Sequence, residues 1–262
     1  MRIALGVEYD GSGFGGWQRQ GHDPNTIQEK LEKAIARVAD HDVLVHCAGR
    51  TDAGVHGVGQ VVHFDTPSVR DMYGWIFGCN TNLPDAISVR WAKVVDEEFH
   101  ARFSARARAY RYVIYNHPVR PALGIKHLTW NFRPLDIGLM QQASRYLLGE
   151  HDFSAFRATG CQAKSPVKEV QKIDLYQRGR LIVLDIQASA FLHHMVRNIA
   201  GVLMAVGCGK QPVDWVQHVL QSKDRKQGAP TAGPYGLYFM RVHYPEHFQI
   251  PAAEPDAPFM PL

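Results

Sequence analysis

The chain has 262 residues, of which 45% are hydrophobic and 21% are charged. This composition is typical of a folded globular protein and excludes a disordered or fibrous chain. The 29 Lys and Arg residues exceed the 25 Asp and Glu residues, so the net charge is +4 and favours an anionic partner only weakly.

The first part of the chain follows the order β-α-β-β-α-β. Alternating apolar residues predict a strand over 3–9, which ends at a turn. Thr26, followed three residues later by Glu29, has the pattern of a capping box and predicts a helix that ends near Ala39. The remaining elements are a helix over 69–78 and strands over 43–47, 58–64 and 87–95. This order is that of the split βαβ, or ferredoxin-like, arrangement.

The second part repeats this order with one extra helix. Its predicted elements are a strand over 106–115, a helix over 136–148 capped by Asp136, a hairpin of 170–176 and 181–188, helices over 191–206 and 213–221, and a strand over 237–244. We therefore expect an α+β fold of two ferredoxin-like lobes, 1–104 and 105–246, with mainly antiparallel sheets. The prolines after Tyr244 predict an extended or disordered tail over 247–262.

Positive charge is concentrated at the start of the second lobe. Residues 99–135 contain no Asp or Glu, and their cations are Arg102, Arg106, Arg108, Arg111, Arg120, Lys126 and Arg133. Strand alternation places Arg106, Arg108, Tyr110 and Tyr112 on one face. Guanidinium groups beside phenol rings suit phosphates and unstacked bases. A solvated basic face is the plainer alternative.

The sequence favours a cytoplasmic protein. The longest apolar stretch between charges, 199–208, is well short of the roughly 20 residues that span a bilayer. An acidic residue at Glu8 interrupts the apolar core that a signal peptide would need. The cysteines lie far apart without a C-x-x-C pair and are expected to be reduced thiols; they are Cys47, Cys79, Cys161 and Cys208.

Two motifs suggest cofactors but fail on spacing. Gly11–Gly16 matches G-x-G-x-x-G, yet the next predicted helix begins about ten residues later, too far to cradle a pyrophosphate. His193 and His194 are adjacent, so on a helix they point about 100° apart and do not form a zinc-binding pair. We expect neither a nucleotide cofactor nor a metal.

One glycine-rich loop contains side chains that could take part in a reaction. Residues 47–57 read C-A-G-R-T-D-A-G-V-H-G between two predicted strands, and the glycines let backbone approach a ligand closely. Asp52 lies two residues from Arg50, near enough for an ion pair that would keep the carboxylate ionised. An ionised carboxylate can act as a nucleophile or as a stabilising charge. Equally, Asp52 could simply cap backbone N–H groups of a hairpin.

The segment 49–56, G-R-T-D-A-G-V-H, resembles the signature of the TruA family of tRNA pseudouridine synthases. Further stretches resemble that family in the same order; they are 9–11 with 16–20, 99–104, 110–112 and 191–198. The resemblance runs from about residue 2 to 245. It implies isomerisation of uridine to pseudouridine at positions 38 to 40 of the tRNA anticodon arm, by a homodimer that uses no metal or organic cofactor.

The resemblance also implies roles for individual residues. Asp52 matches the essential carboxylate, and Tyr110 the ring stacked on the uracil. Arg197 matches an arginine that pairs with the carboxylate, and Arg50 one that holds the extruded nucleotide. Leu237 matches a hydrophobic contact to the base, although the family's T-A-P-A-x-G-L reads T-A-G-P-Y-G-L here. The arginines expected to contact the RNA backbone are Arg102, Arg106, Arg108 and Arg111.

Several alternatives stay open at this point. Asp52 could attack C6 of uracil, attack C1′ of the ribose, or remove the C2′ proton, since all three need an ionised carboxylate. The chain could instead be an RNA-binding module without chemistry. It could also be a uracil C5 methyltransferase, which would need a cysteine nucleophile.

Overall fold

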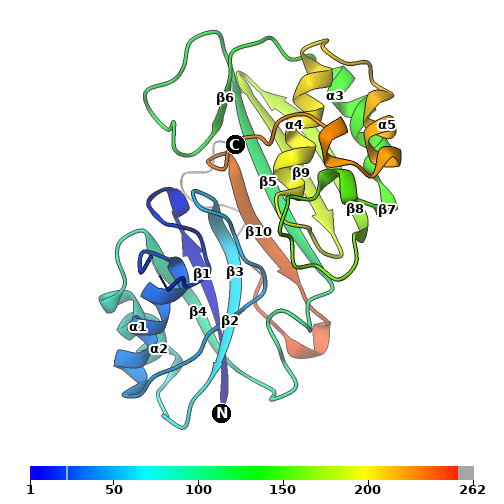
Figure 1. The fold of residues 1–262 in the computed structure, drawn as a ribbon. Coiled ribbons are helices and arrows are strands. Elements are labelled where there is room, and N and C mark those ends of the chain that lie inside the picture. Colours follow the sequence, from blue (N-terminus) through cyan, green and yellow to red (C-terminus); the bar gives the residue numbers. More distant parts are fainter. Residues whose placement is uncertain (22, 253–262) are drawn as a thin grey trace. The chain divides into compact units, whose positions relative to one another are not determined.

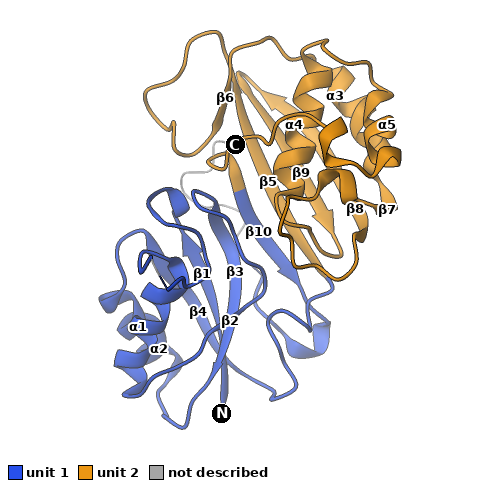
Figure 2. Ribbon diagram, viewed as in Figure 1, with its two compact units in different colours: residues 1–106, 238–260 blue, residues 107–237, 261–262 orange. Residues whose placement is uncertain are grey.

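A computed structural model of the chain describes residues 1–21 and 23–252 (Figure 1). These residues form two compact units, each an α+β structure with a mainly antiparallel sheet, as predicted. Of the described residues, unit 1 holds those within 1–106 together with 238–252, and unit 2 holds 107–237 (Figure 2). The predicted lobes differ from these units mainly because the last strand belongs to unit 1. Of the predicted tail, residues 253–262 lie outside the described part of the chain.

Unit 1 has the strand order β4-β1-β3, with β2 and β10 along the other side of β3. Its elements are β1 (Arg2–Tyr9), α1 (Ile27–Ala39), β2 (His46–Cys47), β3 (His56–Asp65), α2 (Met72–Asn82), β4 (Ile87–Val95) and β10 (Leu237–His243). β1 pairs antiparallel with both β3 and β4, and β2 pairs antiparallel with β3. The order β4-β1-β3-β2 is that of a ferredoxin-like sheet. β10 pairs with β3 in parallel, through Tyr238 opposite His56 and Phe239 opposite Gly57.

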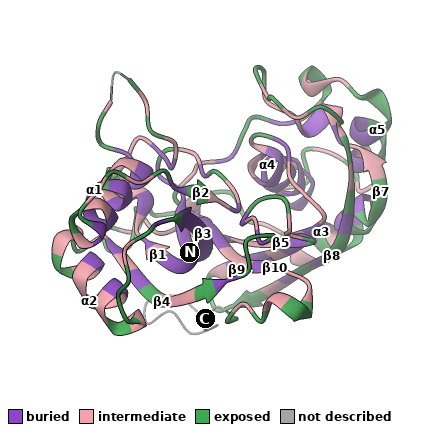
Figure 3. Cartoon of the chain, turned by 90° about the horizontal axis from the view of Figure 1, so that it is seen from below, coloured by how far each residue is buried: buried purple, intermediate pink, exposed green. Residues whose placement is uncertain are grey.

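The core of unit 1 lies between this sheet and the two helices, as the buried residues in Figure 3 show. The apolar face of α1 supplies Leu31 and Ile35, which are fully buried. α2 supplies Trp75, whose ring meets Phe64 edge-on at 5.3 Å, a contact worth about 0.5–1.5 kcal/mol beyond burial. The Thr26 side chain accepts from the Glu29 N–H, which confirms the predicted helix start.

The strand predicted over 43–47 is reduced to two residues. The Val45 N–H donates to Glu32 Oε1 (3.1 Å), and its carbonyl accepts from Gln28 Nε2 (3.5 Å). Because side chains of α1 take these backbone groups, they are not available to a neighbouring strand. Glu32 is itself held by an ion pair with Arg19 at 3.0 Å.

Unit 2 has the strand order β5-β9-β8-β7, with β6 beside β5. Its elements are β5 (Ala107–Asn116), β6 (Thr129–Asn131), α3 (Ile137–Ser144), β7 (Gly149–Asp152), β8 (Val167–Arg178), β9 (Leu181–Ala188), α4 (Met195–Gly207) and α5 (Trp215–Ser222). All of these pairings are antiparallel except that of β5 with β6. Figure 1 shows the three helices gathered on one face of this sheet.

Three features of unit 2 differ from the sequence prediction. The helix predicted over 136–148 ends at Ser144, and a single 3-10 turn follows it over Arg145–Leu147. The short strands β6 and β7 were not predicted. α4 begins at Met195 rather than near residue 191, because His194 has φ +62° and so cannot continue a right-handed helix. The preceding residue is tied to another loop, since the Ala158 N–H donates to the His193 carbonyl at 3.0 Å.

No helix in residues 1–21 and 23–252 combines the length and the apolar character that a membrane span requires.

Candidate active site

The residues 49–56, here called the signature loop, connect β2 to β3. Within the loop, the Val55 N–H donates to the Asp52 carbonyl at 3.1 Å and closes a tight turn. Gly54 has φ +79° in this turn, a left-handed conformation that favours glycine. Asp52 therefore stands at the start of the turn, half-buried, with its backbone fixed.

Thr51 fixes the incoming arm of the signature loop. Its side chain is buried, and its Oγ1 lies 2.9 Å from the hydroxyl of Tyr9. Burial raises the pKa of Tyr9 far above its ordinary value, so this hydroxyl keeps its proton. The Thr51 carbonyl accepts from the Trp17 N–H at 2.9 Å. The residue directly before Asp52 is thus held through both its side chain and its backbone.

Gly16 and Gln60 complete this support. Gly16 has φ +102°, and a Cβ there would lie 3.0 Å from the Thr51 carbonyl oxygen and 3.1 Å from the Ala53 nitrogen. The backbone of residue 16 therefore packs directly against the loop. Gln60, fully buried on β3, donates from Nε2 to the Gly49 carbonyl at 2.6 Å. Neither residue was singled out for such a role from the sequence, although 16–20 belongs to the resembling stretches.

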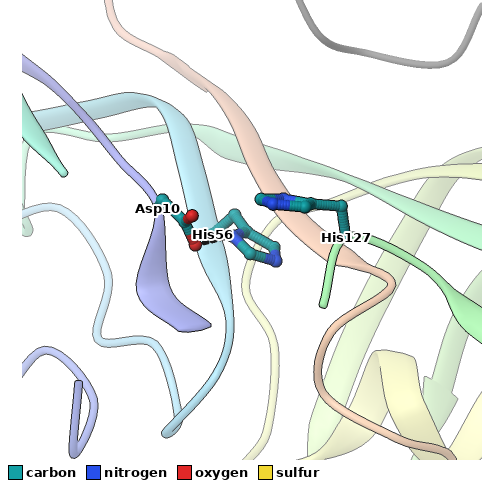
Figure 4. A group of neighbouring side chains, drawn as sticks. All are labelled: Asp10, His56 and His127. Carbon is teal, nitrogen blue, oxygen red and sulfur yellow. Dashed lines mark ion pairs between the residues drawn. The ribbon is translucent and has the colours of Figure 1, made fainter. Parts of the chain in front are cut away.

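His56 fixes the outgoing arm (Figure 4). Its Nδ1 lies 3.1 Å from Asp10 Oδ1 and accepts from the Gly11 N–H at 3.2 Å. The ring stacks on Tyr238 with centroids 4.8 Å apart. Burial, with the negative charge of Asp10, raises the pKa of Tyr238.

The glycine-rich segment 11–16 also approaches the start of α1. The Ile27 N–H donates to the Gly16 carbonyl (3.1 Å), and the Gln28 N–H donates to the Trp17 carbonyl (3.0 Å). The spacing in the sequence predicts a helix start remote from this segment, but in the structure the two are adjacent. Two N–H groups that a phosphate would use are nevertheless already engaged by backbone.

Arg50 and Asp52 are both in the signature loop, Arg50 exposed and Asp52 half-buried. The predicted ion pair between them stays a prediction.

In unit 2, Tyr110 lies on β5 opposite Ile186 of β9. Its ring meets Phe191 edge-on, with centroids 4.9 Å apart. Tyr112, two residues along, is fully buried, and its hydroxyl donates to the Gly233 carbonyl at 2.8 Å. Of the two tyrosines expected on this face, Tyr110 is therefore the more accessible.

The arginines near Tyr110 have different surroundings. Arg106 precedes β5, and Arg108 donates to the Ser189 carbonyl at 3.1 Å. Arg111 forms a two-point ion pair with Asp185, at 2.7 and 2.9 Å. The hydrogen bond to this carboxylate raises the pKa of the Arg111 guanidinium. A phosphate at Arg111 would have to compete with Asp185.

Arg197, in the first turn of α4, is linked to the loop that leads to Leu237. Its Nε donates to the Ala232 carbonyl at 2.9 Å, and the Ala232 N–H returns a hydrogen bond to the Arg197 carbonyl at 3.2 Å. Leu237 is almost fully buried. A Cβ at Gly236 would lie 2.5 Å from the Val113 carbonyl, so this loop packs closely on β5. Unit 2 therefore connects Arg197 and Leu237 through one well-held loop.

Comparison with known proteins decides the family. The tRNA pseudouridine synthase family matches this chain over residues 6–104 and 143–245. The chain belongs to the tRNA pseudouridine synthase family. The matched segments of this pseudouridine synthase include the signature loop, Arg197 and Leu237, whereas Tyr110 lies between them.

Individual relatives of this pseudouridine synthase are similar over nearly their whole length. The tRNA pseudouridine synthase A of Alcanivorax borkumensis is 56% identical, with 100% of this chain and 96% of the relative covered. That of Pseudomonas aeruginosa is 58% identical, over 95% and 88% of the two chains. That of Coxiella burnetii is 54% identical, over 98% of each.

Proposed function

We propose that this chain isomerises uridine to pseudouridine at positions 38, 39 and 40 of the tRNA anticodon stem-loop. The observation that carries the proposal is the position of Asp52, in a family signature loop whose two arms are tied to the sheet through Thr51 and His56. A carboxylate on such a support is preorganised, and preorganisation is what an enzyme needs more than a binding module does.

The reaction requires a base that has left its stack. Product and substrate have the same atoms: the bond between N1 and C1′ breaks, a bond between C5 and C1′ forms, C5 loses a proton and N1 gains one. There is no net oxidation or reduction. Extruding the base costs a few kcal/mol, and stacking on an aromatic ring returns about 1–3 kcal/mol.

We assign Asp52 as the reacting carboxylate and Tyr110 as the ring that stacks on the uracil. As the family resemblance implies, Arg50 holds the extruded nucleotide and Arg197 pairs with the carboxylate. Leu237 makes a hydrophobic contact with the base. Attack at C6, attack at C1′ and removal of the C2′ proton remain three routes for the same carboxylate.

We further propose that the enzyme acts in the cytoplasm as a homodimer on tRNA. The acid-free segment 99–135, with its seven cations, supports a polyanionic partner. Affinity for tRNA should therefore fall steeply as salt concentration rises, because phosphate contacts release counterions. An affinity independent of salt would argue against this segment as a binding surface.

Mapping of pseudouridine in total cellular tRNA tests the function directly. Deleting the gene should remove pseudouridine from positions 38 to 40, and reintroducing the wild-type gene should restore it, whereas an Asp52→Asn gene should not. Pseudouridine that persists at all three positions after deletion would contradict the proposal and favour a binding module without chemistry.

A further inference from the structure

The turn that follows β4, residues 100–104 and here called the aromatic turn, presents an exposed ring. Phe103 is 75% exposed, and the Arg102 guanidinium lies over its ring, 5.5 Å from the centroid. A single exposed apolar residue is ordinary on a protein surface. A phenylalanine combined with an overlying cation is a more specific arrangement, because guanidinium groups and rings together bind nucleotides.

A row of packed aromatic rings connects Phe103 to the core of unit 1. The His100 ring lies 4.3 Å from Phe103, and the His63 ring lies 4.6 Å from His100. His46 stacks on His63 at 5.0 Å and lies 5.3 Å from His100. At the inner end, the fully buried Phe99 meets His63 edge-on at 6.0 Å. The rings thus run continuously from the core of unit 1 to its surface.

Histidine nitrogens fix the backbone of the aromatic turn. Nδ1 of His100 accepts from the N–H groups of Arg102 (3.1 Å) and Phe103 (3.3 Å). Nδ1 of the buried His63 accepts from the Ala101 N–H at 3.1 Å. These nitrogens accept only while they are unprotonated. Burial lowers the pKa of His63 to about 3 and also lowers that of His100, so both rings are neutral at physiological pH.

Residues 244–249 also support the aromatic turn and the adjoining Phe99. The Tyr244 hydroxyl donates to the Ala101 carbonyl at 2.6 Å. Phe248 meets Phe99 edge-on at 5.2 Å, and Lys93 donates to the carbonyls of Phe248 and Gln249. Phe103 therefore projects from a rigid support, and a ligand that stacks on it would lose little entropy in ordering the protein.

We propose that Phe103, Arg102 and His100 form a stacking platform for an unpaired base of the substrate RNA, with the guanidinium beside the adjoining phosphate. The platform lies outside the signature loop and contacts a nucleotide other than the one that reacts. The proposal rests on the proposed function only in that the partner is RNA.

Charge favours RNA over a protein partner. The aromatic turn lies at the start of the acid-free segment 99–135, whose seven Lys and Arg residues follow three acidic residues, Asp96, Glu97 and Glu98. A polyanion gains from such a region, and every base offers a π-face to a ring. By contrast, a second copy of this basic chain would bring like charge to the same place.

Equilibrium binding measured by fluorescence anisotropy tests the platform without requiring turnover. The full-length protein is titrated with a fluorescein-labelled anticodon stem-loop RNA and with a fully paired RNA duplex of equal length. Phe103→Leu should weaken binding of the stem-loop about 5- to 150-fold, the range for loss of one stacked base. It should change duplex binding less than about twofold, and Phe103→Trp should restore stem-loop affinity.

Phe77→Leu is the matched control. Phe77 is also exposed and stacked on a neighbour, Tyr73 at 4.0 Å, but it lies on a helix without any charged residue. This variant should bind both RNAs as the wild type does. Thermal unfolding of all variants shows whether they fold.

Two results would overturn the platform. They are unchanged stem-loop affinity in Phe103→Leu, with or without a changed oligomeric state, and an equal loss of affinity for stem-loop and duplex. A wild type that binds the stem-loop but makes no pseudouridine would refute the proposed function and leave the platform supported by its own binding data.

Discussion

The hydroxyl of Tyr9 and the Oγ1 of Thr51 lie 2.9 Å apart in the buried interior of unit 1. This hydrogen bond connects the end of β1 to the residue that precedes Asp52. The proposed reacting carboxylate is thus positioned by a residue more than forty positions earlier in the chain.

Tyr9→Phe should lower both stability and turnover. The substitution leaves the Thr51 hydroxyl buried without this partner, which should reduce the free energy of unfolding by about 1–3 kcal/mol. A double-mutant cycle with Thr51→Val, read by urea denaturation and by kcat, measures the coupling. Simple additivity of the two substitutions in both measurements would contradict a positioning role for Tyr9.

Gly16→Ala should be strongly disruptive. Its φ of +102° is unfavourable for alanine, and the new Cβ would lie 3.0 Å from the Thr51 carbonyl. We expect a loss of about 1–3 kcal/mol in the free energy of unfolding and a fall in kcat. Gly13→Ala is the control, because a Cβ at Gly13 meets nothing within 4 Å. Equal urea midpoints for the two variants would contradict the close packing of residue 16 on the signature loop.

The buried His63 should make the protein sensitive to acid. Its pKa is about 3 in the folded protein and near 6.5 when unfolded. Between these values the unfolded chain binds the additional proton, so the free energy of unfolding falls as pH falls from about 6.5 towards 3. The slope from this group reaches at most about 1.4 kcal/mol per pH unit.

His63→Gln removes this titration while its side-chain oxygen can still accept from the Ala101 N–H. Urea denaturation between pH 7 and pH 4.5 should show a flatter dependence on pH for the variant than for the wild type. Parallel curves would show that His63 does not stay neutral in the folded protein.

The cysteines separate isomerisation from a methyltransferase mechanism. Burial raises the pKa of Cys47 and of Cys79 to about 12, which makes both poor nucleophiles. Burial opposes ionisation of Cys161 too, but hydrogen bonds from the His193 N–H, the backbone of Ala163 and the Arg157 guanidinium outweigh it and lower its pKa. Iodoacetamide should therefore alkylate Cys161 before Cys47 and Cys79, as mass spectrometry can measure.

A variant with all four cysteines replaced by serine should still form pseudouridine. Loss of turnover in such a variant, with a normal unfolding transition, would instead support a thiol mechanism.

The sequence predicted elements well where the local signals were strong. β4 has the predicted bounds, and α1 begins where Thr26 caps it. α2 begins three residues later than predicted, because the Asp71 side chain accepts from the Gly74 N–H and fixes the helix start there. Periodicity alone does not show which of several polar residues will cap a helix.

Contacts distant in sequence account for the remaining differences. Nothing in the sequence 43–45 shows that Gln28 and Glu32 will bind the backbone groups of Val45. Nothing in the sequence 238–239 shows that these residues will pair with β3. For the candidate site, Asp52 could be chosen from its motif. The support of Asp52 by Tyr9 and Gly16 could not be predicted. A hydrogen bond between two hydroxyl groups and a close approach of two backbone segments leave no periodic pattern in the sequence.

Release of tritium from tRNA that carries [5-³H]uridine tests the central claim most directly. The wild type and Asp85→Asn, a change at an exposed carboxylate between α2 and β4, should both release tritium. Asp52→Asn should reduce the rate by more than about a thousandfold while its affinity for tRNA stays within about threefold. Release by Asp52→Asn at the wild-type rate would contradict the assignment of Asp52 as the reacting group.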